Sequence, residues 1–311
     1  MPGFEAAYIE AYRSGRLRRS LAEARERMSS CVLCPRMCRV DRRAGETGVC
    51  RTGHRASVAS FNAHFGEEAP LVGTNGSGTV FFTHCNLLCL FCQNFEISHE
   101  GIGEEVSDEQ IAGIMVALQR QGCHNINFVT PSHVVPQILG ALELAVPAGL
   151  NVPLVYNSGG YDRIETLQLL DGVIDIYMPD FKFWDPEAAR KTCNAPDYPE
   201  TARQALKEMH RQVGDLELDE RGIARRGLLV RHLVMPGGMA GTPQVMRFIA
   251  RDVSPRTYVN VMSQYRPCGR AHEVAGLEAA LSADECHSAV RAAIAEGITR
   301  LEQRPRSFRR G

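Results

Sequence analysis

The chain has 311 residues, enough for one large α/β domain with an extension or for two smaller domains. Its 35 lysines and arginines nearly balance 36 aspartates and glutamates, so net charge gives no argument for a nucleic acid or a membrane as partner. The sequence lacks a basic segment leading into an apolar run and a run of apolar residues long enough to span a bilayer, so we expect a cytoplasmic protein.

The first predicted element is an arginine-rich amphipathic helix over residues 5–29, which packs on the main domain. Residues 30–75 are rich in cysteine, glycine and arginine and show little periodicity. That composition predicts a loop-rich module organised by a metal rather than by a core, and we expect its last part, Ser57 to Asn75, to be a loop.

Four cysteines in this module have the spacing C-x2-C-x3-C-x11-C, which is a complete set of metal ligands: Cys31, Cys34, Cys38 and Cys50. Clustered cysteines in a reducing compartment indicate a metal more often than a disulfide, but they say little about which metal. Structural zinc and an auxiliary iron-sulfur cluster both fit. Because four thiolates leave no open position for a substrate, we expect a closed site.

From residue 78 onward, six apolar runs alternate with helical patterns. The runs predict strands at 79–82, 126–129, 153–156, 174–178, 228–234 and 257–261. Helices are predicted at 107–121, 134–148, 162–171, 186–211 and, before a basic tail, 282–302.

This alternation predicts a parallel sheet and an α/β fold. We expect a partial (β/α)6 TIM-like barrel with a Cys-rich N-terminal extension. The chain then divides into a module at 1–75, a barrel at 76–270 and a C-terminal helix with a basic tail at 271–311. Working residues in such folds follow the carboxyl ends of the strands.

Three cysteines follow the first of the six strands with the spacing C-x3-C-x2-C: Cys85, Cys89 and Cys92. Three thiolates on a four-iron cluster leave one iron open, as a catalytic metal site requires. The alternatives are a zinc site with His84 or His99 as fourth ligand, and a cluster that only transfers electrons. The four remaining cysteines of the chain are scattered and are predicted to be small buried hydrophobic residues: Cys123, Cys193, Cys268 and Cys286.

The three-cysteine loop, with aromatic Phe91 before the third cysteine, resembles the defining motif of the radical S-adenosylmethionine (SAM) superfamily. The resemblance implies a 4Fe-4S cluster whose open iron binds SAM, and an electron donor such as flavodoxin or ferredoxin. Reductive cleavage of SAM would give methionine and a 5'-deoxyadenosyl radical that abstracts hydrogen from a substrate, which is oxidoreductase chemistry. Phe91 would border the adenine.

A longer stretch, from His64 through Gly76-Ser77-Gly78-Thr79 to Cys92-Gln93-Asn94, is similar to homologues of pyruvate formate-lyase activating enzyme. With the segments below, the similarity covers about residues 30 to 270. It implies that a glycine of a partner enzyme is the substrate. Radical modification of a small molecule or peptide is an alternative, and so is a non-catalytic electron carrier or scaffold.

The same resemblance implies roles for five polar residues. The turn at Asn157 and Ser158 would contact SAM and a monovalent cation, and Asp180 would help to bind that cation. Lys182 and Arg231 would face SAM. Without a ligand, Asp180 and Lys182 would be a surface ion pair, and Arg231, costly to bury alone in an apolar strand, would need Asp180 as partner.

Two segments depart from the activating-enzyme pattern. Where those enzymes have Gly-Gly-Glu, this chain has Thr130-Pro131-Ser132-His133, and we expect Ser132 or His133 to hold the SAM amino group. A histidine that those enzymes carry near Tyr265-Arg266 is missing. Glu67 and Glu68 are adjacent and would point apart in an extended segment, so they make a poor acid pair.

Overall fold

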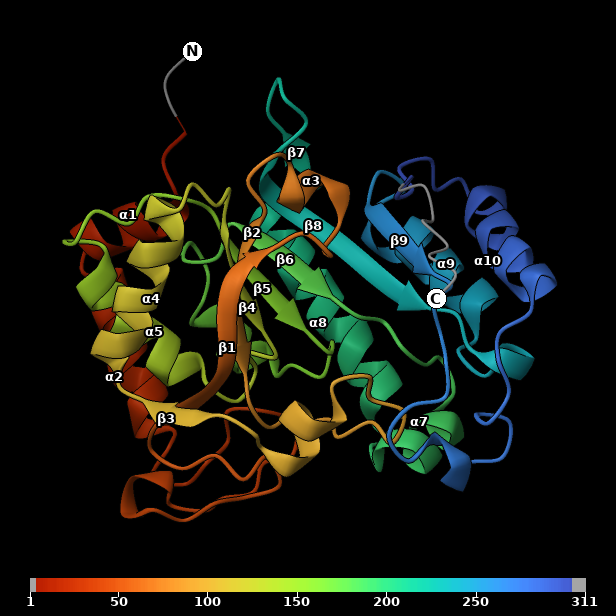
Figure 1. Ribbon diagram of the computed structural model, residues 1–311, viewed down its shortest axis with the longest axis horizontal. Coiled ribbons are helices and arrows are strands. Elements are labelled where there is room, and N and C mark those ends of the chain that lie inside the picture. Colours follow the sequence, from red (N-terminus) through yellow and green to blue (C-terminus); the bar gives the residue numbers. More distant parts are fainter. Residues whose placement is uncertain (1–3, 304–311) are drawn as a thin grey trace.

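The computed structural model describes residues 4–303, and its centre is a sheet with six neighbouring parallel strands (Figure 1). Their order follows the chain: β2 (Ser77–Phe82), β4 (Ile126–Val129), β5 (Leu154–Ser158), β6 (Ile176–Pro179), β8 (Ala224–Leu233) and β9 (Tyr258–Met262). All six predicted strands are present. The predicted α/β fold with a mostly parallel sheet is confirmed, and its strand order is consistent with a partial barrel.

Three antiparallel strands extend the sheet at its edges: β1 (Ala56–His64) on β2, β3 (Glu104–Val106) on β1, and β7 (Glu217–Leu218) on β8. The prediction of a loop from Ser57 to Asn75 is therefore wrong over its first half. A bulge between Val58 and Ser60 shifts the pairing of β1 by one residue. Because the bulge breaks the regular alternation of inward and outward side chains, the sequence of β1 has no two-residue period to detect.

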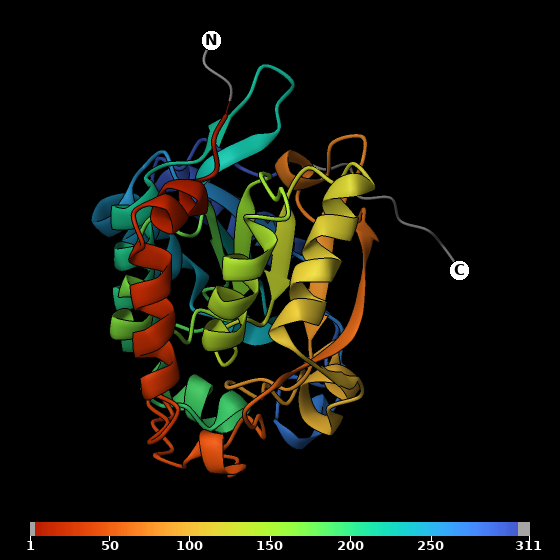
Figure 2. The ribbon, with the colours of Figure 1, turned by 90° about the vertical axis from the view of Figure 1, so that its left-hand side faces the viewer.

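Helices cover the outside of the sheet, and Figure 2 shows α2, α5 and α4 side by side on one flank. The helices are α1 (Ala7–Arg13), α2 (Arg16–Glu26), α3 (Ala69–Val72), α4 (Asp108–Arg120), α5 (Val135–Ala145), α6 (Ile164–Gln168), α7 (Pro186–Cys193), α8 (Tyr198–Val213), α9 (Thr242–Phe248) and α10 (Ala283–Ala295). Five short helical turns complete the chain: η1 (Arg42–Ala44), η2 (Glu96–Glu100), η3 (Pro236–Gly238), η4 (Ile249–Val253) and η5 (Ala271–Glu273).

Two helices predicted as continuous are broken. The helix expected over 5–29 is interrupted at Gly15, which has a φ of 72°, and the one expected over 186–211 is interrupted at Asn194, which has a φ of 48°. Left-handed backbone ends a helix, and glycine and asparagine adopt it most readily. The last helix ends at Ala295 rather than at 302, just before Gly297 with a φ of 88°.

The two faces of the parallel strands pack differently. Outward side chains such as Phe128 and Tyr156 join a large core with the helices. Inward side chains make a smaller core in which Val155, Met178 and Leu229 contact Leu71 of α3. Because side chains alternate along a strand, the residues two positions further on point inward as well. That rule places the polar ends of β5, β6 and β8 over this inner core.

The large core takes side chains from all three predicted parts of the chain, including Tyr8, Phe128 and Ala293. The division at residues 75 and 270 stays a prediction. The basic tail, with Arg304, Arg306, Arg309 and Arg310, lies outside the described residues. Within residues 4–303 no helix is both long and apolar enough to cross a bilayer.

Buried Asp175 joins the N-terminal helices to the sheet. Its carboxylate accepts hydrogen bonds from the backbone N–H of Ala7, at the start of α1, and of Leu154, at the start of β5, at 2.8 and 3.0 Å. The side chain thus caps α1, whose own N-cap residue, Ala6, has no side chain able to do so. Burial raises the pKa of Asp175 to about 7.

We expect Asp175→Asn to flatten the pH dependence of stability. A carboxyl with a raised pKa favours the folded state when protonated, so its contribution is complete below its ordinary pKa of about 3.9. The contribution is lost as the pH rises through about 7. Urea midpoints measured from pH 5 to 8 should fall with pH more steeply for the native chain than for the variant. Parallel curves would contradict this account; Asp252→Asn, an exposed change, is the control.

Candidate functional site

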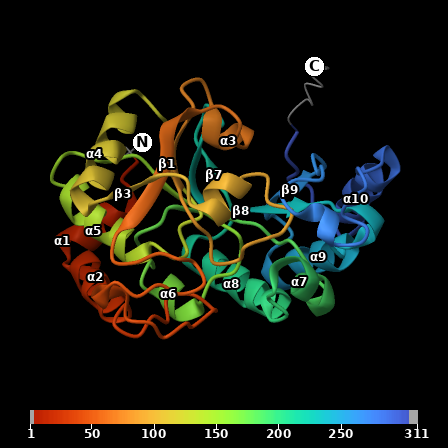
Figure 3. The same ribbon diagram turned by 60° about the horizontal axis from the view of Figure 1, so that its bottom comes forward.

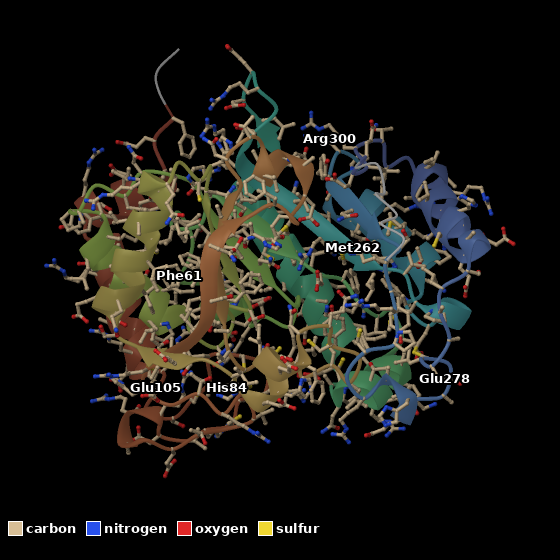
Figure 4. All side chains as sticks on the ribbon, in the orientation of Figure 1. Phe61, His84, Glu105, Met262, Glu278 and Arg300 are labelled. Atoms are coloured by element: carbon tan, nitrogen blue, oxygen red, sulfur yellow. The ribbon has the colours of Figure 1, made fainter. Side chains whose placement is uncertain are left out.

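One cavity of about 270 Å³ lies at the carboxyl ends of the parallel strands. Met262, at the end of β9, marks it in Figure 4. It is lined by the three cysteines assigned to the cluster and by six residues assigned to SAM or its cation: Cys85, Cys89, Cys92, Phe91, Asn157, Ser158, Asp180, Lys182 and Arg231. Residues as far apart in the chain as Cys85 and Arg231 therefore share one site.

The three thiols on the loop after β2 suit an iron-sulfur cluster. The backbone N–H of Leu87 donates to Cys85 Sγ at 3.3 Å, and the hydroxyl of Ser98 donates to Cys92 Sγ at 3.2 Å. Hydrogen bonds to sulfur stabilise thiolates and tune the potential of iron-sulfur clusters. Burial raises the pKa of Cys85 to about 12, so a metal that binds there displaces a proton.

The two histidines considered as a fourth zinc ligand do not line this cavity. His84 lies at the lower edge of the molecule near Cys50 and Arg51 (Figure 4). His99 stacks on Phe95, with ring centroids 4.0 Å apart. As the side chains of residues 4–303 stand, no three or more His, Cys, Asp or Glu form a site for a single metal ion. Thiolates on a four-iron cluster each bind a different iron.

Arg231 is the centre of a buried ionic network. Its Nε donates to Asp180 Oδ1 at 2.8 Å and its Nη2 donates to Asn157 Oδ1 at 2.6 Å. Glu67 Oε2 lies 3.7 Å from Nη1. Lys182 Nζ donates to the other carboxylate oxygen of Asp180. A backbone bridge pairs Asp180 with Arg231, so the register of β6 and β8 fixes this contact.

Burial and charge oppose each other in this network, and charge decides the outcome. Burial works against ionisation of Asp180, but Arg231 and Lys182 outweigh it and lower the pKa of that carboxyl. In the same way Asp180 raises the pKa of Lys182 in spite of burial. The side chains of Asp180 and Lys182 are only 11% and 14% exposed, so the alternative of a surface ion pair is wrong.

Three other residues are positioned firmly. Phe91 lines the cavity but is only 4% exposed, and it packs edge-on against Phe183 at 5.8 Å. The Ser158 hydroxyl donates to Asp162 Oδ2 at 2.6 Å. The Tyr198 hydroxyl accepts from the backbone N–H of Lys182 at 2.8 Å, which holds the chain just after Asp180.

Two expectations about polar residues are wrong. Ser132 and His133 are buried and do not line the cavity; Thr130, in a left-handed conformation with a φ of 61°, lines it instead. The expectation of an extended segment at Glu67 and Glu68 does not hold: Glu67 Oε2 lies 3.7 Å from Arg231 Nη1, and Glu68 Oε1 accepts a hydrogen bond from Asn260 Nδ2 at 2.8 Å. The reason is that the chain turns at Glu68 into helix α3, so the two residues are not in a strand.

The four N-terminal cysteines converge on a second, much smaller cavity. Cys31, Cys34, Cys38 and Cys50 line about 10 Å³ together with Arg42 and His133. Burial raises the pKa of Cys34 to about 12. The four cysteines thus line one small cavity, although as placed they do not form a site for a single metal ion, and a metal there stays a prediction.

Sequence reasoning missed several contacts. Cys193, predicted to be a buried hydrophobic residue, donates from its thiol to Cys89 Sγ at 3.3 Å. Ser98, Thr130 and Gln264 line the cavity as well. No spacing in the sequence indicates these four, because each is brought to the site by a separate turn of the chain.

Comparison with known proteins adds a family to this geometry. A family model described as the Radical SAM superfamily matches residues 79–215, a range that holds the three-cysteine loop, Asp180 and Lys182. The chain is also 30% identical over 274 residues to an uncharacterized protein of Methanocaldococcus jannaschii, a stretch that covers 86% of this chain and 75% of that protein.

Arg231→Met should cost about 3 kcal/mol of stability, because it removes a cation that faces the buried carboxylates of Asp180 and Glu67. Lys207→Met, which breaks an ion pair with Asp252 whose side chains are 51% and 49% exposed, should cost less than about 1 kcal/mol. Urea unfolding of the metal-free proteins at neutral pH compares the two. Equal losses would show that Arg231 is not the centre of the network.

Proposed function

Because this chain belongs to the radical SAM superfamily, we propose that Cys85, Cys89 and Cys92 hold a four-iron cluster with one open iron, at which SAM binds. When bound there, the cluster would supply the electron for cleavage of SAM to methionine and a 5'-deoxyadenosyl radical, which would take a hydrogen atom from the substrate. The observation that carries the proposal is the cavity that joins the three thiols to the ionic network of Asp180, Lys182 and Arg231. Flavodoxin or ferredoxin is the proposed source of the electron.

Each polar residue has a proposed task at this site. Lys182 and Arg231 offer cationic donors to the SAM carboxylate, and their shared partner Asp180 keeps both charged and oriented. Asp180, Asn157 and Ser158 offer oxygens to a monovalent cation beside it. Phe91, fixed by Phe183, borders the adenine. The apolar lining residues Leu87, Val129 and Leu233 exclude water, which protects a radical from side reactions.

We propose a large substrate that inserts a slender group, such as a glycine of a partner enzyme, into the cavity. About 270 Å³ is slightly below the roughly 300–1,000 Å³ typical of ligand cavities, which leaves little room for a bulky substrate beside SAM. The resemblance to activating enzymes supports the same choice. A protein that modifies a small molecule or peptide would need a larger remaining cavity.

The first experiment is anaerobic cluster reconstitution followed by dithionite and SAM, with 5'-deoxyadenosine measured. We expect 5'-deoxyadenosine from the native chain and at least about a hundredfold less from Cys89→Ala. Loss of a cluster ligand should cost at least as much as loss of a residue that only supports a ligand, which costs up to about a hundredfold. Cys193→Ser is the matched control, since it changes the neighbouring thiol without removing a proposed ligand. Product from Cys89→Ala at the native rate, or none from a fully loaded native chain, would overturn the proposal.

Lys182→Met should weaken SAM binding by at least about tenfold, because a hydrogen bond to a charged group contributes about 1.5–3 kcal/mol. Calorimetric titration of the anaerobic holoprotein with SAM measures this. Lys191→Met, an exposed change on α7, is the control. An unchanged affinity for Lys182→Met would remove this residue from the proposed SAM site.

A further inference from the structure

The segment after α2, which carries the N-terminal cysteines, passes α6 (Figure 3) and lies against the three-cysteine loop, because Arg36 donates to the carbonyls of Asn86 and Leu87. We define the quartet as Cys31, Cys34, Cys38 and Cys50, and the cluster loop as residues 83–92. We propose that the quartet holds an anionic metal-thiolate centre and that Arg36 and Arg42 connect this centre to the cluster loop, so that metal in the quartet keeps the loop in shape. This rests on the proposed function, because the loop is taken to hold the catalytic cluster.

The first argument is the charge of Arg42. Its side chain is only 1% exposed and lines the quartet cavity. Its Nε donates to the carbonyl of Gly53 and its Nη1 to the carbonyl of His133, but Nη2 has no hydrogen-bond partner. A buried cation needs a counter-charge, and Cys31 Sγ lies 3.9 Å from Nη1. Four thiolates with zinc, or with an iron-sulfur cluster, carry a net negative charge. Such a centre supplies the counter-charge that the guanidinium of Arg42 needs.

The second argument is the reach of Arg36, which lies between Cys34 and Cys38. Its guanidinium donates to the carbonyls of Asn86 at 2.8 Å and Leu87 at 3.2 Å, which stand between the first two cysteines of the cluster loop. It also donates to the carbonyls of Cys193, at 2.8 Å, and Asn194. One side chain of the quartet segment therefore ties the cluster loop to the end of α7.

A second connection runs through Arg42 to the start of the loop. The carbonyl that accepts from Arg42 belongs to His133, whose Nε2 donates to the carbonyl of Thr83 at 3.0 Å. Thr83 lies two residues before Cys85. Arg36 and Arg42 thus connect the quartet segment to the cluster loop on both sides of Cys85.

Backbone conformation shows that both segments need support. Among described residues other than glycine, seven have positive φ, and five of them are in or beside these segments: Met37, Arg39, Arg51, His84 and Leu88. Such residues persist only where their surroundings hold them. The local apolar core of the quartet segment consists of Met28, Cys31 and Leu33 with Val40 against it, which is small for a segment of this length.

The first test asks whether the quartet binds metal by itself. Zinc, iron and sulfide are counted in the full chain carrying Cys85→Ala, Cys89→Ala and Cys92→Ala after anaerobic reconstitution. We expect either about one zinc or about four irons with equal sulfide, which separates the two metals. Adding Cys34→Ala to this variant should abolish metal binding by the quartet. No more metal in the triple variant than in the quadruple variant would overturn the proposal.

The second test asks whether Arg36 transmits the effect of that metal. With all cysteines present, Arg36→Gln should release the iron of the cluster loop to a ferrous chelator at least about tenfold faster, because several charged hydrogen bonds are lost. The quartet metal should stay, and exposed Arg39→Gln should behave like the native chain. The kinetic phase in which metal leaves the quartet is identified from the variant with Cys85→Ala, Cys89→Ala and Cys92→Ala.

A double-variant cycle separates positioning from general stability. In a Cys34→Ala background the quartet is empty, so Arg36→Gln should add less than about twofold to the release rate. Full additivity would overturn the coupling, as would native release from Arg36→Gln. If Arg36→Gln unfolds in either background, Arg36→Lys replaces it. Lysine keeps the charge but cannot reach carbonyls on both sides. The 5'-deoxyadenosine assay tests the proposed function separately. If no 5'-deoxyadenosine forms but the iron-release rates are as expected, the proposed function is wrong and the coupling between the quartet and the cluster loop stands.

Discussion

The register of three neighbouring parallel strands determines the site. β5 and β6 end opposite each other, and Asp180, directly after β6, bridges to Arg231 within β8. Asn157, Asp180 and Arg231 therefore meet although they are far apart along the chain. A shift of one residue in any of these strands would turn its polar side chain toward the helices. The ionic network, the placement of Lys182 and the shape of the cavity all follow from this register.

The network also explains how charged groups are tolerated beside a cavity that needs to exclude water. Two cations and the carboxylates around them offset one another, and the backbone bridge between Asp180 and Arg231 fixes their geometry. Charges arranged in advance cost no reorganisation when an ionic ligand such as SAM arrives. The same arrangement makes the network expensive to disturb, because removal of one partner leaves another buried without its counter-charge.

The two cysteine groups, separate in the sequence, form one structural unit. Arg36 and Arg42 link the quartet to the cluster loop through backbone carbonyls, and α7 joins from the other side through Cys193 and Asn194. Residues other than glycine hold a left-handed conformation only where their surroundings fix them, and these contacts do so. The quartet segment therefore lies behind the cluster loop and supports it, while the cavity itself is lined by residues from Phe81 onward.

Local patterns in the sequence predicted two cysteine sites and the alternation of strands and helices. The spacing of Cys85, Cys89 and Cys92, the spacing of the quartet and the six apolar runs are local patterns, and a local pattern survives in the sequence. Only the tertiary structure decided which distant groups meet. The bulge in β1, the contact of Cys193 with Cys89, the turn that brings Glu67 and Glu68 to Arg231, and the displacement of His133 from the cavity to the quartet all depend on packing between segments far apart in the chain. Such contacts leave no periodic signal in the sequence, because the path of the backbone in space determines which residues meet.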